Sequence, residues 1–241
     1  MIQPDFIEVY DGLLSPVVCR DLIERFERSL AAGRSPTSSD TDSSSDGSEL
    51  PLDSQPGWSD ARQALNDAAL RGFRHYLRRY GHAALGPLRF EVQDPITSAP
   101  VTLNARGIAA LGDESLNSLI LQLFRPGGVY VRRHRGDAGG EPGWRHELYP
   151  NPSLDDAESL HRVLLWSVYL NDGFHEGETE FLYQARTITP KTGSLVIAPT
   201  AFTHTYRQKT PKGGDRYVAS GWILFRRADT FFDASASSVQ R

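Results

Sequence analysis

The chain has 241 residues, 39% of them hydrophobic and 23% charged, with a formal net charge of −4, which predicts one large soluble domain over residues 1–241. Acidic residues outnumber basic ones and no block of lysines or arginines occurs, so we expect no nucleic-acid partner. No hydrophobic run approaches the roughly 18 residues that span a membrane, and no secretion signal is recognised, so we expect no membrane partner.

The chain begins with an alternating strand at 6–10, followed by a helix. Ser15 is a suitable N-cap and the following proline a suitable first helical residue, and a hydrophobic stripe continues until Gly33. Cys19 lies within this helix, where we expect it to be buried. A single cysteine excludes a disulfide framework and favours a reducing, cytoplasmic location.

Residues 1–114 together predict a helical support region interrupted by one long loop. From about 35 to 55 the sequence is almost entirely Ser, Asp, Thr and Gly, which cannot bury enough hydrophobic surface to order itself, so we expect a disordered loop. A second helix is expected from about Ser59 until Gly81.

Residues 115–228 change to short runs rich in Val, Leu, Ile, Tyr and Thr, separated by Gly, Pro and Asn. Helices followed by closely spaced strands predict a mainly β fold, an antiparallel sandwich or barrel braced by helices. The expected strands are 119–124, 129–133, 163–170, 180–188, 194–198, 202–206 and 217–225.

The same half contains motifs in a definite order. Tyr-Leu-Asn at 169–171 is followed by Gly-Glu-Thr-Glu-Phe at 177–181, by a Pro-Lys-Thr-Gly turn at 190–193, by His204, and by Arg216 twelve positions later. This order resembles the prolyl-4-hydroxylase-like branch of the Fe(II)/2-oxoglutarate-dependent oxygenases, whose pattern is YLN, GGxTxF, PxxG, a distal histidine and a basic residue about ten positions on. The resemblance covers about residues 119–226.

The resemblance implies a double-stranded β-helix, or jelly roll, as the core at 115–228. It implies Fe(II) as metal, 2-oxoglutarate as cosubstrate and O₂, with ascorbate as a further candidate. His204 is then the distal iron ligand and Arg216 the anchor for the 2-oxoglutarate carboxylate, for which a guanidinium offers two parallel hydrogen bonds. Thr179 and Tyr130 would face the barrel interior beside the cosubstrate.

The remaining two iron ligands are ambiguous, because the His-x-Asp or His-x-Glu pair of the family is absent. The segment at 143–150 resembles a WHxExYP form of the branch, but Arg145 stands where the ligand histidine belongs. His146 and Glu147 could reach one metal together only through a β-bulge, which puts consecutive residues on one side. We take this pair as the first candidate.

The alternative pair is His134 and Asp137, at the end of the expected strand 129–133. Here the second position after the histidine is Gly136, and the acid comes one residue late. Radical halogenases of the superfamily have His-x-Gly, since a missing carboxylate leaves a coordination position for chloride, so this alternative implies halogenation.

The predicted function is therefore Fe(II)- and 2-oxoglutarate-dependent hydroxylation of an unactivated C–H bond in a peptide, amino acid or small metabolite. The glycine-, proline- and arginine-rich segment at 125–160 is the expected lid. Halogenation is one alternative. The other, from a different functional class, is a catalytically inactive β-helix that binds a ligand or partner, which the departure at Arg145 favours. The sequence leaves the substrate and the oligomeric state open.

Overall fold

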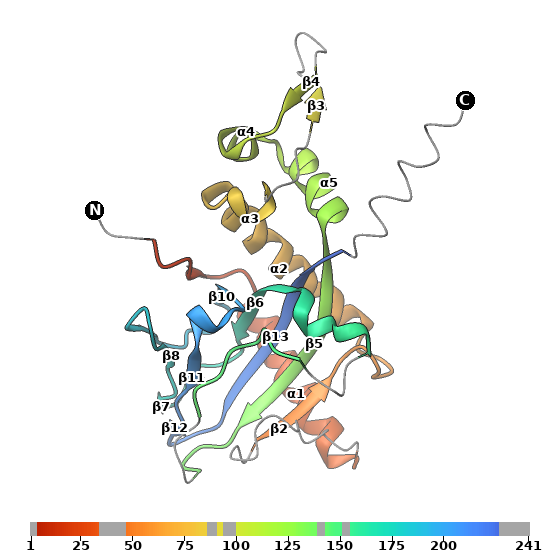
Figure 1. Cartoon of the computed structure of the whole chain (residues 1–241). Helices are drawn as coiled ribbons and strands as arrows, with labels where there is room; N and C mark the ends of the chain where they lie inside the picture. The colour runs from red at the N-terminus through yellow and green to blue at the C-terminus, as the bar shows by residue number, and fades with distance from the viewer. Residues whose placement is uncertain are drawn as a thin grey trace.

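The computed structural model describes residues 4–33, 47–85, 91–93, 100–138, 143–150 and 155–226 (Figure 1). The helices are α1 (Pro16–Ala31), α2 (Ser59–Arg79), α3 (His82–Leu85), α4 (Ala105–Ala110) and α5 (Asp113–Leu123), with the 3-10 helices η1 (Asp155–His161) and η2 (Phe202–His204). The strands are β1 (Glu8–Tyr10), β2 (Ser48–Pro51), β3 (Glu91–Gln93), β4 (Pro100–Thr102), β5 (Phe124–His134), β6 (Arg162–Tyr169), β7 (His175–Glu176), β8 (Thr179–Phe181), β9 (Arg186–Ile188), β10 (Leu195–Pro199), β11 (Tyr206–Gln208), β12 (Pro211–Lys212) and β13 (Arg216–Phe225).

Two facing sets of antiparallel strands build the core. The large sheet has the order β1-β10-β6-β13-β5-β2, and the small set consists of β11-β8-β9 and β12-β7. A hydrophobic cluster between the two sets takes Tyr169, Val218 and Trp222 from the large sheet and Phe181 and Tyr206 from the small one. This arrangement is the predicted jelly roll, and its interior is the space between the two sets.

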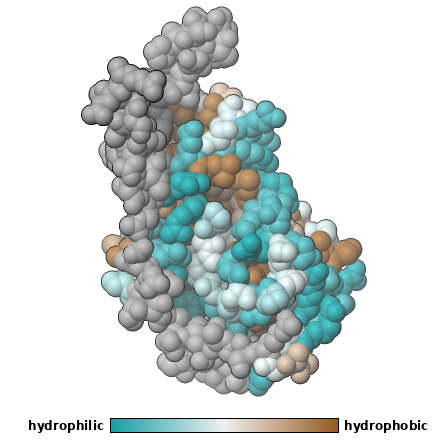
Figure 2. Space-filling view, turned by 90° about the vertical axis from the view of Figure 1, so that its right-hand side faces the viewer, coloured by the Kyte–Doolittle hydropathy of each residue, from teal (hydrophilic) through white to brown (hydrophobic). Residues whose placement is uncertain are grey.

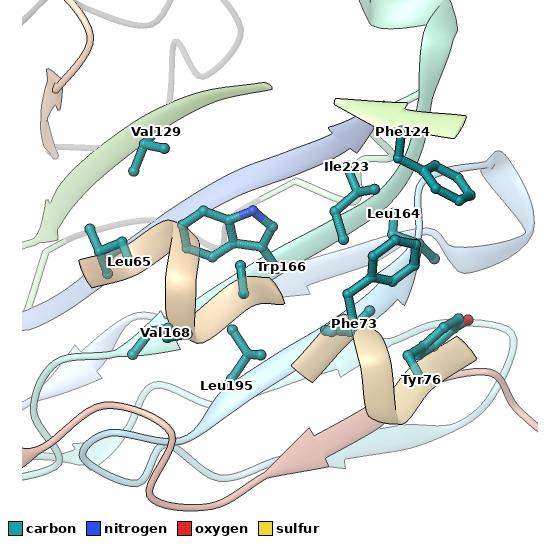
Figure 3. Packing of buried hydrophobic residues seen from close by; sticks show 14 of the residues in the cluster. Leu65, Phe73, Tyr76, Phe124, Val129, Leu164, Trp166, Val168, Leu195 and Ile223 are labelled. Carbon is teal, nitrogen blue, oxygen red and sulfur yellow. The ribbon is translucent and has the colours of Figure 1, made fainter. Parts of the chain in front are cut away.

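The other face of the large sheet is covered by helices, as predicted. Figure 3 shows Leu65 and Phe73 of α2 lying against Trp166 and Leu195 of the sheet. The helix approaches so closely that a Cβ added at Gly72 would lie 2.2 Å from Leu195 Cδ2. Each large side chain buried here contributes about 1.5–3 kcal/mol, so this interface holds the barrel wall rigid.

Several predicted elements are correct. Helix α1 begins after Ser15, whose side chain accepts a hydrogen bond from the Val18 amide, and Cys19 is fully buried, as expected. Helix α2 begins at the predicted residue, Ser59.

Other elements are corrected. Residues 119–123 are the C-terminal part of α5 and not a strand, and Phe124 begins β5. The buried residues of the helix recur at helical spacing on one face: Leu116, Leu119, Ile120 and Leu123. Part of the predicted loop 35–55 forms β2, which pairs with β5, while residues 34–46 lie outside the described residues. The expected strand 180–188 is a hairpin of β8 and β9.

The expected lid at 125–160 is also revised, because its first ten residues belong to β5 and its end to η1. Residues 139–142 and 151–154 lie outside the described residues. The described face in Figure 2 is mostly hydrophilic, with hydrophobic residues in small separate patches. Among the described helices, none is long and apolar enough to cross a membrane.

Candidate functional site in the barrel

Strand alternation places a polar set inside the barrel. Arg216 begins β13, directly opposite His134 at the end of β5. Tyr169 ends β6, Thr179 begins β8 and Gln208 ends β11. Residues at alternate positions of a strand share a face, so these side chains gather at one end of the interior.

Arg216 is the centre of this set and is fully buried. One of its nitrogens, Nη1, donates to the carbonyl oxygens of Gly177 at 2.5 Å and Lys209 at 3.3 Å, and Nη2 donates to Gln208 Oε1 at 3.2 Å. These acceptors are all neutral, and among the described residues no carboxylate pairs with Arg216. Burial lowers the pKa of Arg216 to about 10, so the side chain remains charged at neutral pH.

Two hydroxyl groups line a small cavity next to Gln208, the side chain that accepts a hydrogen bond from Arg216. Tyr169 Oη and Thr179 Oγ1 are hydrogen-bonded at 2.7 Å and both face a cavity that Gln208 also lines. The cavity measures about 10 Å³, room for one water molecule. Thr179 therefore faces the interior, and its role beside a cosubstrate stays a prediction. Tyr130 also points inward, but it packs edge-on against Trp222 at 5.5 Å between ring centroids.

His134 adds an uncharged polar group to the same end. Burial and, after it, the nearby guanidinium groups of Arg216, Arg145 and Arg132 lower the pKa of His134 well below its usual value, so the imidazole is neutral. Its Nε2 atom is buried without a hydrogen-bond partner among the described residues. Arg216 forms no ion pair among the described residues, although Glu178 acts on it from a longer distance. A buried cation without an ion-pair partner favours an anionic ligand here, and His134 offers an unpaired imidazole nitrogen beside it.

A second cluster contains Arg145, Glu147 and Tyr206. Arg145 and Tyr206 form an antiparallel bridge through both backbone hydrogen bonds, at 2.9 and 2.8 Å. The phenol of Tyr206 donates to Glu147 Oε1 at 2.5 Å and accepts from Arg145 Nε at 3.2 Å, and Arg145 Nε lies 4.0 Å from the same carboxylate oxygen.

The other oxygen of Glu147 is also engaged. Arg162 Nη1 lies 3.4 Å from Oε2 and Trp222 Nε1 donates to it at 3.3 Å, while the Arg162 guanidinium stacks 3.6 Å from the Trp222 ring centroid. Burial raises the pKa of Glu147, but Arg145 and the Tyr206 hydrogen bond outweigh it, and the net pKa is lowered. Glu147 is therefore an ionised carboxylate held by two arginines.

The three residues predicted as iron ligands are not brought together. The described residues contain no group of three or more His, Cys, Asp or Glu side chains that could hold a metal ion. His204 ends η2 instead of lying on a strand, and both its ring nitrogens are used, with Thr203 Oγ1 at 3.0 Å and the Asp5 carbonyl at 2.9 Å. His146 faces the ring of Tyr149.

The alternative pair, His134 and Asp137, is explained by a turn. Asp137 adopts a positive φ of 57°, and its carboxylate accepts from the Gly213 amide at 3.3 Å. A Cβ at Gly136 would lie 2.6 Å from the Gly214 carbonyl oxygen, so glycine is needed there for close packing. The His-x-Gly sequence thus has a structural cause, and Asp137 pairs with backbone and not with His134.

The cluster around Glu147 does not fit Fe(II). Of its members only Glu147 is a usual ligand for this ion, whereas two histidines and one carboxylate are needed. Two unit charges 4 Å apart interact by about 4 kcal/mol at an effective dielectric constant of 20. A divalent cation on Glu147 would meet roughly twice that repulsion from Arg145 alone, so the positive charge required by the carboxylate is already present.

Sequence reasoning assigned no role to Tyr206, which the structure brings into contact with Glu147 and Arg145. It lies ten residues before Arg216, the interval that the family pattern gives for the distal ligand, whereas His204 lies twelve before. Tyr206 also alternates with Gln208 on β11, so both face inward while Arg207 pairs outward with Glu180. The ten-residue interval to Arg216 was a usable signal for Tyr206. It was overlooked because histidine is a common metal ligand and tyrosine is not.

Solved structures confirm the fold. Over 92% of this chain and 97% of the other, it matches a viral collagen prolyl hydroxylase from Paramecium bursaria chlorella virus-1, solved as a 2-oxoglutarate complex, with a TM-score of 0.55 and 16% identity. A Pseudomonas putida prolyl-4-hydroxylase matches over 92% and 94% of the two chains, with TM-score 0.54 and 17% identity. A Trichoplax adhaerens prolyl hydroxylase, in complex with a hypoxia-inducible-factor peptide, matches over 98% and 88%, with TM-score 0.59 and 11% identity.

No protein-family model and no curated protein matches the sequence. The likeness at these identities establishes the fold. The chain therefore has the jelly roll of the prolyl 4-hydroxylases, as the motif order predicted.

Proposed function

We propose that this protein is a non-catalytic member of the jelly-roll fold that binds a small dicarboxylate, with 2-oxoglutarate as the first candidate, at Arg216. The observation that carries the proposal is the burial of Arg216 without a carboxylate partner among the described residues. A buried charge without a counter-charge is costly, and a bound carboxylate would supply the missing charge.

The neighbouring groups suit such a ligand. A carboxylate is a stronger acceptor for a guanidinium than the neutral amide oxygen of Gln208, which now occupies Nη2. The neutral imidazole of His134 and the hydroxyls of Tyr169 and Thr179 supply further hydrogen bonds. Gln208 lines the neighbouring cavity and occupies Arg216 Nη2, so in this proposal a ligand carboxylate displaces Gln208 from Arg216.

Titration calorimetry with 2-oxoglutarate on chelator-treated protein tests the proposal. We expect measurable binding without added metal, and loss of one charge-assisted interaction predicts at least a tens-fold weaker affinity in Arg216→Ala. The matched control is Arg207→Ala, which removes an outward-facing arginine of the neighbouring strand that pairs with Glu180. Arg216→Lys keeps the buried charge, so this variant should fold and retain more affinity for 2-oxoglutarate than Arg216→Ala. It thereby separates loss of the anchor from misfolding.

The proposal fails if 2-oxoglutarate does not bind the wild-type protein. It also fails if the affinity falls equally in the two alanine variants. A lower affinity for 2-oxoglutarate in Arg207→Ala alone would identify Arg207 as the anchor instead of Arg216.

The second candidate is the predicted Fe(II)- and 2-oxoglutarate-dependent hydroxylation of a C–H bond, with a peptide as one substrate class. The likeness to prolyl hydroxylases over more than nine-tenths of the chain favours it, including one solved with 2-oxoglutarate and one with a peptide. The poor fit of Fe(II) to the Glu147 cluster ranks it second. Succinate release from 2-oxoglutarate, dependent on added Fe(II) and abolished in Glu147→Ala, would reverse this order.

A further inference from the structure

The geometry points to a metal centre that the protein has replaced by an internal ion pair. We propose that Arg145, Glu147 and Tyr206 occupy the three ligand positions of a divalent transition-metal site, and that two substitutions to histidine would make the site bind metal. This inference concerns the cluster at Glu147 and does not depend on ligand binding at Arg216.

The backbone has the arrangement that such a site needs. Arg145, at an isolated bridge, and Glu147, at a bend, are two residues apart. They are held by hydrogen bonds from Arg145 N to Tyr206 O and from Glu147 N to Thr200 O, at 2.9 and 3.0 Å. Tyr206 lies directly opposite Arg145 in the bridge. Three side chains from two neighbouring segments therefore converge, as two nitrogen ligands and one carboxylate do in a facial three-ligand centre.

The side-chain atoms of the three residues meet at one point. Tyr206 Oη lies 2.5 Å from Glu147 Oε1 and 3.2 Å from Arg145 Nε. Glu147 is 7% exposed, so this contact is screened from solvent. The Arg145 guanidinium supplies the positive charge beside the carboxylate that a metal ion would otherwise provide, and the Tyr206 hydroxyl completes the contact.

Two neighbouring groups already orient the carboxylate of Glu147, and one of them, Arg162, also carries a positive charge. Arg162 and Trp222 hold the second carboxylate oxygen of Glu147 at 3.4 and 3.3 Å, which fixes the carboxylate while Oε1 faces Arg145 and Tyr206. Groups that orient a ligand in this way strengthen metal sites. Arg145→His would remove the repelling charge, and Tyr206→His would supply the second imidazole.

Anaerobic titration with Co(II), followed by its visible d–d absorption and by calorimetry, tests the inference. We expect no saturable binding in the wild type. In Arg145→His/Tyr206→His we expect binding of one ion per chain, at least 100-fold tighter than any weak binding by the wild type. Adding Glu147→Gln to this double variant should abolish the binding again. The matched control is Arg145→His/Arg207→His, whose second histidine points outward from the same strand.

Two results would overturn the inference. One is stoichiometric Co(II) binding by the wild type that Glu147→Gln removes, since the site would then already hold metal. The other is a folded double variant, shown by an unchanged circular dichroism spectrum, that binds Co(II) no better than the control. If the double variant does not fold, Tyr206→His alone is titrated, and it should bind more weakly than the micromolar range because Arg145 remains; tight binding there would contradict the inference.

Discussion

The stability of the Glu147→Ala variant, measured without metal, distinguishes most clearly whether Glu147 belongs to an internal ion pair or to a metal site. Removal of the carboxylate leaves Arg145 and Arg162 without their shared counter-charge and leaves the Tyr206 hydroxyl without its acceptor. Breaking a buried ion pair by removing one partner costs about 3–5 kcal/mol. For a domain of this size, each kcal/mol lowers the melting temperature by roughly 2–4 °C, so we expect a decrease of about 6–20 °C.

The assay is urea and thermal unfolding of chelator-treated protein, followed by circular dichroism. Glu180→Ala is the control, because the Glu180–Arg207 pair lies at the partly exposed outer side of the small sheet, where such pairs are worth about 1 kcal/mol or less. The reasoning is refuted if Glu147→Ala and Glu180→Ala lower the free energy of unfolding equally. It is also refuted if the effect of Glu147→Ala appears only when metal is added.

Three further predictions follow from neighbouring contacts. Gln208→Ala removes the group that competes for Arg216 Nη2 and enlarges the cavity. Calorimetry should therefore show 2-oxoglutarate binding about fivefold tighter, which corresponds to the roughly 1 kcal/mol of one hydrogen bond; weaker binding would mean that Gln208 contacts the ligand. Because the pKa of His134 is lowered, the unfolded chain takes up a proton near pH 6.5 while the folded chain does not. The contribution of His134 to the free energy of unfolding is therefore full above pH 6.5 and falls below it by up to about 1.4 kcal/mol per pH unit. Urea unfolding at pH 5 and pH 7 should show a smaller decrease in the free energy of unfolding for His134→Gln than for the wild type. His204→Ala should leave Co(II) and 2-oxoglutarate titrations unchanged and lower stability by about 1–2 kcal/mol through its contact with the Asp5 carbonyl; an altered titration would return His204 to the site.

The sequence predicted the fold because its signals are local and mutually consistent. The cap at Ser15 and the helix start at Ser59 are determined by a few neighbouring residues. The run at 119–124 was wrongly assigned to a strand, because a short run with five hydrophobic residues does not distinguish a strand from the end of a helix whose first turn was overlooked. β2 was missed because its hydrophobic residues are few and its strand partner, β5, lies about 80 residues away.

The roles predicted for the site residues stay predictions. The structure shows that Arg216 is buried and that Thr179 lines an interior cavity, positions that follow from their places on the strands. The contact of Tyr206 with Arg145 could not be predicted, because the sequence does not reveal the strand register. The short helix η2 moves His204 off the strand, and Tyr206 takes the position opposite Arg145. Pairing between segments about 60 residues apart decides which side chains meet, and spacing within one segment does not reveal it.

The account's central claim is that the barrel holds a carboxylate at Arg216 and holds no metal at Glu147. A crystal structure of protein grown anaerobically with Fe(II) and 2-oxoglutarate, with data collected at the iron absorption edge, tests both halves at once. We predict electron density for a carboxylate on Arg216 and no anomalous peak beside Glu147, with Arg145 and Tyr206 still in contact. An iron peak coordinated by Glu147, with the Arg145 side chain displaced, would contradict the account.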